Sequence, residues 1–69
     1  MLYVLEFYIE KSGGRRSLLD AFQSGSRTLL DVRLEATSIM TNVRFGDRAA
    51  TVCVVRDKRG AVVCQLRPV

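Results

Sequence analysis

The first ten residues of the chain alternate imperfectly between a fully apolar set and a mixed set that contains Glu6, which is typical of a β-strand buried on one face and partly covered on the other. Every second position from Tyr3 to Ile9 is apolar, and β-branched and aromatic residues are dense here. We therefore expect a strand over residues 1–10. Its aromatic residues have two interpretations, a surface on which nucleobases stack or part of the core, and we favour the core.

Residues 17–24 show the spacing of a short helix instead. Ser17, with Asp20 three residues later, is a variant of the capping box that begins a helix, and Gly25 suits its C-terminal cap. At about two turns such a helix is not stable by itself in water, so it must pack on the sheet. Its apolar stripe consists of Leu18, Leu19 and Phe22.

From residue 28 onward the alternation returns and predicts an antiparallel meander of four strands, over residues 28–36, 39–45, 49–56 and 61–67. Two-residue turns at residues 37–38 and 46–47 join the first three strands, and every register that these turns imply puts the apolar residues on the same side. Thr37-Ser38 lacks the Gly or Asn that such a turn prefers. One long bent strand over residues 28–45 is the alternative.

The turn at residues 57–60, Asp-Lys-Arg-Gly, is the clearest local signal in the chain. Asp at its first position and Gly at its fourth match a three-residue hairpin loop with a bulge. In the register of this loop Val54 lies opposite Cys64, and Cys53 points to the other face, so we expect no disulfide. A symmetric four-residue loop would put Cys53 opposite Cys64 and mix the two faces, which burial of one face disfavours.

Together these elements predict an α+β fold in the order β-α-β-β-β-β, with the helix on the apolar face of the sheet and one small domain over residues 1–69. Ordering each residue costs about 1.5 kcal/mol, which a core of this size barely offsets, so a second copy as partner is a natural source of stability. No run approaches the ~18 apolar residues of a membrane span, and we find no signal sequence. We therefore expect a cytoplasmic protein without a membrane partner.

The formal charge of +4, carried largely by arginine, makes nucleic acid a candidate partner. Guanidinium groups suit bidentate contacts with phosphate, although a GC-rich genome gives the same preference for Arg over Lys. The Gly13-Gly14 pair is predicted to form a turn rather than a phosphate loop, since no Walker-type lysine follows it. A solvated face whose charges pair with one another is the alternative to a nucleic-acid surface. The predicted contacts are Arg33, Arg44 and Arg67 on the outer sheet face, with Arg15, Arg16, Lys58 and Arg59 at the periphery.

The outer face of the C-terminal hairpin indicates a different class of function. In the predicted register Val55 and Val63 are adjacent there, with Ala61 nearby, and form an apolar patch. Either the N-terminal segment covers this patch or the patch is an interface. The edge strand over residues 61–67 could also pair with a second copy, although Pro68 blocks its extension.

Catalysis has little support in these residues. His is absent, the two Cys lack a base nearby in sequence, and Cys and carboxylates do not have the spacing of metal ligands. We therefore expect a protein that is not an enzyme, with no cofactor, no metal and no small-molecule substrate. The sequence favours a small basic nucleic-acid-binding or regulatory module, and the alternative is a protein-interaction domain that forms a homodimer through the C-terminal hairpin.

Overall fold

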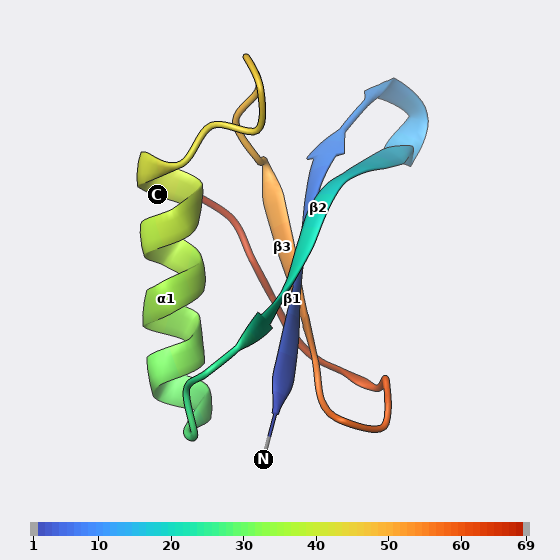
Figure 1. Cartoon of the computed structure of the whole chain (residues 1–69). Helices are drawn as coiled ribbons and strands as arrows, with labels where there is room; N and C mark the ends of the chain where they lie inside the picture. The colour runs from blue at the N-terminus through green and yellow to red at the C-terminus, as the bar shows by residue number, and fades with distance from the viewer. Residues whose placement is uncertain (1, 69) are drawn as a thin grey trace.

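An α-helix packed on one face of a four-stranded antiparallel sheet makes up the computed structural model, which describes residues 2–68 (Figure 1). The strands lie in the order β2-β1-β3-β4. The α+β class is confirmed, but the chain order is β-β-α-β-β, so the predicted order β-α-β-β-β-β is wrong. The elements are β1 (Tyr3–Glu10), a 3-10 turn η1 (Ser12–Gly14), β2 (Arg16–Ser24), α1 (Leu29–Asn42), β3 (Val52–Arg56) and β4 (Val62–Leu66).

The strand β1 lies in the interior of the sheet, in keeping with the dense apolar residues on its two faces. It pairs antiparallel with β2 on one side and with β3 on the other. The strand predicted over residues 1–10 is confirmed for Tyr3–Glu10, while Met1 lies outside the described residues. The predicted turn after it is also confirmed, because Gly13 and Gly14 take the positive φ angles, 80° and 77°, that a tight reversal needs.

The strand β2 occupies the residues for which the sequence predicts a helix, so that prediction is wrong. Its pairing with β1 contains a bulge, which leaves Leu19 without a partner in the ladder. The extra residue lets Leu19 and Phe22, three positions apart, both pack on the face that carries α1. The bulge therefore imitates the spacing of a helical stripe. A two-turn helix is weak by itself, whereas this strand pairs with β1 on both sides of the bulge.

The helix α1 replaces the strands predicted over residues 28–36 and 39–45, and the alternative of one long strand is wrong as well. Thr28 caps its first turn, since the side-chain oxygen of Thr28 accepts from Asp31 N at 3.2 Å. Within residues 2–68 no helix is long and apolar enough to cross a membrane. The residues of α1 that are buried against the sheet recur every four positions: Val32, Ala36 and Met40.

The strand-like alternation in this segment comes from the outer side of α1. Leu30 and Leu34 lie there with 67% and 62% of their surface exposed. Read together with Val32 and Ala36 on the opposite side, these two leucines give apolar residues at every second position. The pattern is therefore the sum of two faces of one helix.

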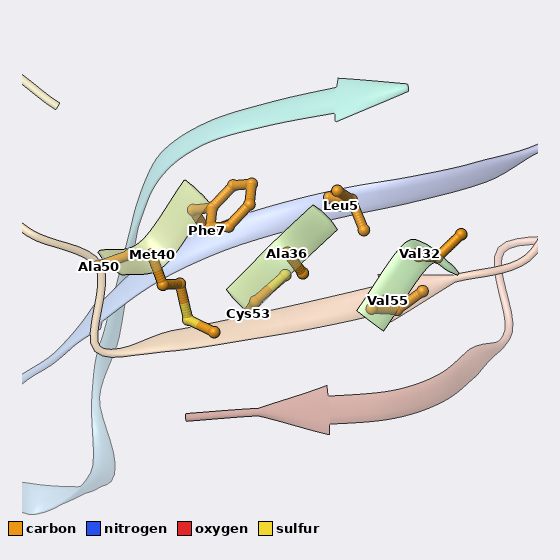
Figure 2. Close-up of a cluster of buried hydrophobic side chains, with 8 residues drawn as sticks. All are labelled: Leu5, Phe7, Val32, Ala36, Met40, Ala50, Cys53 and Val55. Atoms are coloured by element: carbon orange, nitrogen blue, oxygen red, sulfur yellow. The ribbon is translucent and has the colours of Figure 1, made fainter. Parts of the chain in front are cut away.

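The core lies between α1 and the sheet, and Figure 2 shows its side chains. β1 and β3 each contribute alternate residues to it, and α1 covers them from one side. Phe45, after the helix, stacks on Phe7 with ring centroids 5.4 Å apart, so the segment between α1 and β3 closes one end of the core. The buried cluster consists of Leu5, Phe7, Val32, Ala36, Met40, Ala50, Cys53 and Val55.

The predicted two-residue turn at residues 46–47 is present, but it joins no pair of strands. Phe45 N donates to Arg48 O at 2.7 Å, and Arg48 N donates to Phe45 O at 3.3 Å. Gly46, at the first turn position, has a positive φ of 70°, as two-residue hairpin turns of the primed types require. The local turn chemistry therefore holds even though the meander around it does not form.

The C-terminal hairpin has the predicted loop and a different register. Asp57 N donates to Ala61 O at 2.9 Å, and Gly60 has a φ of 85°, as the three-residue loop requires. A further bulge follows at Val63, so Val55 lies opposite Cys64 instead of opposite Val63. The prediction that Val54 faces Cys64 is therefore wrong.

This bulge also places the two cysteines on the same face of the sheet. Cys53 is buried in the core and Cys64 packs against it from β4. The predicted placement on opposite faces is wrong because a one-residue shift turns every later side chain over. Both cysteines are nevertheless free thiols, as predicted.

The side chains that alternate away from α1 form a second sheet face, which we call the open face. No helix of residues 2–68 lies on it (Figure 1). Val52 and Val54 are nevertheless only 0% and 4% exposed there, so neighbouring long side chains must cover them. The open face consists of Val4, Glu6, Tyr8 and Glu10 on β1, Arg16, Leu18, Ala21 and Gln23 on β2, Val52, Val54 and Arg56 on β3, and Val62, Gln65 and Arg67 on and after β4.

Candidate functional site

One end of the sheet collects segments from the whole length of the chain. β1 and β4 end there and β2 and β3 begin there, because each strand is antiparallel to its neighbour. α1 ends on the same side, and residues 43–51 cross from it to β3 (Figure 1). Thr51 ties this crossing to β1: its N–H donates to Tyr8 O at 2.9 Å, and its Oγ1 accepts from Glu10 N at 2.8 Å.

The segments at this end are rich in Arg and Lys. Six of the eleven Arg and Lys residues of the chain lie in them, together with two of the seven acids, Glu10 and Asp47. Positive charge is therefore concentrated on one side of the molecule. We call this group of cations the basic end: Lys11, Arg15, Arg16, Arg44, Arg48 and Arg67.

The predicted nucleic-acid contacts are only partly brought together. Lys58 and Arg59 lie in the loop at the opposite end of the sheet, and Arg33 lies exposed on α1. Lys11 and Arg48, which sequence reasoning misses, lie in turns that only the strand order shows to be neighbours. Because α1 replaces two predicted strands, the outer sheet face expected to carry Arg33, Arg44 and Arg67 does not exist. The predicted residues at the basic end are Arg15, Arg16, Arg44 and Arg67.

On the open face, two arginines of the basic end share one carboxylate. Arg67 Nη1 donates to Glu10 Oε1, and Arg16 Nε lies 3.7 Å from Glu10 Oε2. Arg16 Nη2 also donates to Gln65 Oε1 at 3.0 Å, so side chains of the two edge strands meet across the face. Val52, which is buried, lies on the same face opposite Tyr8 of β1.

A second carboxylate on the open face, that of Glu6, accepts from two neighbours through one of its oxygens. Arg56 Nε donates to Glu6 Oε1 at 2.7 Å, and the hydroxyl of Tyr8 donates to the same oxygen at 3.1 Å. Burial, followed by this hydrogen bond to Glu6, raises the pKa of Tyr8, and the hydrogen bond to Glu6 raises the pKa of Arg56. Glu6 and Arg56 both line a depression of about 500 Å³ beside the β3–β4 loop. Their ion pair gives the half-buried Glu6 carboxylate a partner and so stabilises the sheet surface.

The cysteines are placed for packing. Burial raises the pKa of the Cys53 thiol to about 12, and burial also raises the pKa of Cys64. A thiol needs a lowered pKa to act as a nucleophile at neutral pH, and both shifts run in the other direction. In the described part of the chain, no three or more His, Cys, Asp or Glu side chains are grouped so that they could hold a metal ion.

The apolar patch predicted on the C-terminal hairpin does not form as expected. Val55 is 0% exposed beneath α1, so it is not available to a partner. The physical reason is the pairing of β3 with β1, in which Val55 lies opposite Leu5 and both belong to the core, while the bulge leaves Val63 without a partner in the ladder. Ala61 and Val63 remain accessible, and β4 is an edge strand of the sheet.

Comparison with known proteins gives no match to a family model, to a curated protein or to a solved structure. What the chain binds must therefore be inferred from the placement of its own side chains.

Proposed function

We propose that this chain is a small nucleic-acid-binding module without catalytic activity, and that the basic end contacts the phosphate backbone. The observation that carries the proposal is the uneven charge: six of the eleven Arg and Lys residues lie at one end of the sheet with two of the seven acids. Clustered guanidinium and ammonium groups attract phosphates by releasing condensed counterions. Arginine adds bidentate contacts with individual phosphates.

The loops of the two hairpins, β1–β2 and β3–β4, provide a matched test. The β1–β2 turn carries the exposed pair Lys11 and Arg15, at the basic end, and the β3–β4 loop carries the exposed pair Lys58 and Arg59, at the opposite end. Alanine substitution of either pair removes one lysine and one arginine. The two double variants therefore have the same net charge and differ only in where the charge is lost.

Binding of a fluorescein-labelled single-stranded oligonucleotide is measured by anisotropy over a range of salt concentrations. We expect Lys11→Ala with Arg15→Ala to weaken binding about tenfold. The decrease of log K with log salt should also become less steep, by about 1.4 in slope, as for two lost phosphate contacts. We expect Lys58→Ala with Arg59→Ala to change affinity by less than about twofold. Equal losses in both variants, or affinity that does not depend on salt, would contradict the proposal.

A second candidate is self-association through β4, the edge strand. Val62 and Val63 are adjacent on it and 47% and 38% exposed, although the bulge at Val63 and the nearby Pro68 both limit pairing with another strand. Sedimentation at rising concentration should show a dimer that Val63→Asp dissociates. Leu30→Asp, at a position on α1 that is 67% exposed, is the control and should leave the dimer intact. A monomer at all concentrations would exclude this candidate.

A further inference from the structure

We infer that Arg16 and Arg67 form an anion site on the open face, that Glu10 occupies it in the free protein, and that a phosphate group of a bound strand displaces Glu10. This inference rests on the proposed function and specifies where one phosphate binds. It makes Glu10 a built-in competitor of the ligand.

The geometry of the three side chains is that of a bound anion. The two guanidinium groups come from β2 and from the end of β4, at opposite edges of the sheet, and converge on one carboxylate of β1. Gln65 Oε1 accepts from Arg16 Nη2 at 3.0 Å and so fixes the direction of the Arg16 side chain. Two guanidinium groups against one carboxylate leave a net positive charge at this point of the surface.

The donors of this site are only partly used. A guanidinium group has five N–H donors, and the contacts to Glu10 and Gln65 engage a few of them. Donors already held in one orientation lose little conformational freedom when a ligand binds. A phosphodiester, with two non-bridging oxygens and a full negative charge, can accept from both arginines at once.

Glu10 can give up its place without loss of the fold. Its side chain is 33% exposed and those of Arg16 and Arg67 are 30% and 55% exposed, so these ion pairs are screened by water and individually weak. The backbone of Glu10 is held separately, because Glu10 N donates to Thr51 Oγ1 at 2.8 Å. The carboxylate can therefore swing away while β1 stays in register.

A pair of isosteric neutral substitutions tests the inference. Glu10→Gln and Asp47→Asn each remove one negative charge from the same end of the sheet, but only Glu10 contacts Arg16 and Arg67. We expect Glu10→Gln to tighten binding of the labelled single-stranded oligonucleotide about fivefold at low salt and to steepen the salt slope by about one. Asp47→Asn should change affinity by less than about twofold. Adding Arg16→Ala to Glu10→Gln should remove the gain.

Three outcomes separate this inference from the proposed function. If the wild type binds the oligonucleotide but Glu10→Gln and Asp47→Asn behave alike, the inference fails and the proposed function stands. If no variant binds, the proposed function fails and the inference falls with it. If Glu10→Gln tightens binding of inorganic phosphate but not of the oligonucleotide, the site takes a free phosphate and the assignment to a strand is overturned. Thermal unfolding of every variant, with Glu10→Ala included, shows whether a difference in binding comes from lost folding.

Discussion

The side chain of Val55 packs beneath α1, while that of Val63, at the bulge of the neighbouring strand, is 38% exposed. If the hairpin had only its loop and no further bulge, these two valines would lie opposite each other and share one environment. The bulge separates them. The extra residue in β4 thus decides which side chains of β4 share a face with Val55.

This separation predicts unequal costs for the same substitution. We expect Val55→Ala to lower the free energy of unfolding by about 2 kcal/mol, because it leaves a cavity in the core. Val63→Ala should change it by less than about 0.5 kcal/mol. Urea unfolding followed by circular dichroism measures both, and equal values would contradict the bulged register.

The buried thiol of Cys53 predicts a dependence of stability on pH. Burial raises its pKa to about 12 in the folded protein, from an ordinary value of 9.0. Above pH 9 the unfolded chain loses this proton while the folded chain keeps it, so the stability present below pH 9 is lost as the pH rises toward 12. The loss is at most about 1.4 kcal/mol per pH unit. Cys53→Ala should not show this part of the decline. The free energy of unfolding of both proteins is measured from about pH 8 to 10.5, and a decline of the same size in both would contradict the prediction.

At the scale of elements, two similar capping signals have different outcomes. Thr28 with Asp31 begins α1, whereas Ser17 with Asp20 lies inside β2. We expect Thr28→Ala to cost about 1 kcal/mol of stability, since it removes the acceptor for Asp31 N, and Ser17→Ala to cost less than about 0.5 kcal/mol. Thermal unfolding of both variants checks this, and a larger loss for Ser17→Ala would show that the strand assignment is wrong.

The same elements show what the sequence could and could not predict. The turns at residues 13–14, 46–47 and 57–60 were predictable because glycine at positive φ acts locally. The interchange of helix and strand was not, because the bulge at Leu19 gives β2 a helical spacing and the exposed Leu30 and Leu34 give α1 a strand-like one. Tertiary packing decides between the helical period and the strand period, and a local sequence pattern does not show that packing.

At the scale of the whole molecule, the candidate site depends on topology more than on any motif. Arg15 and Arg16 could be predicted as phosphate contacts from their charge, and so could Arg67, but that they share an end of the sheet follows from β1 lying between β2 and β3. The sequence places β1 in no register, so it does not show that Glu10 would meet Arg67. A surface assembled from turns is therefore visible only once the strand order is known.

The concentration of charge at the basic end predicts a stability effect that needs no ligand. Like charges held together repel one another, and added salt screens them over about 10 Å at 0.1 M. We therefore expect the melting temperature of the wild type to rise with salt. The double variant Lys11→Ala with Arg15→Ala should be more stable than the wild type at low salt, by about 0.5 kcal/mol, and its melting temperature should depend less on salt. Lys58→Ala with Arg59→Ala, at the end with fewer cations, should keep the wild-type salt dependence. If both double variants respond to salt as the wild type does, the positive charge is not concentrated enough to strain the fold, and the electrostatic basis for phosphate attraction at this end is removed.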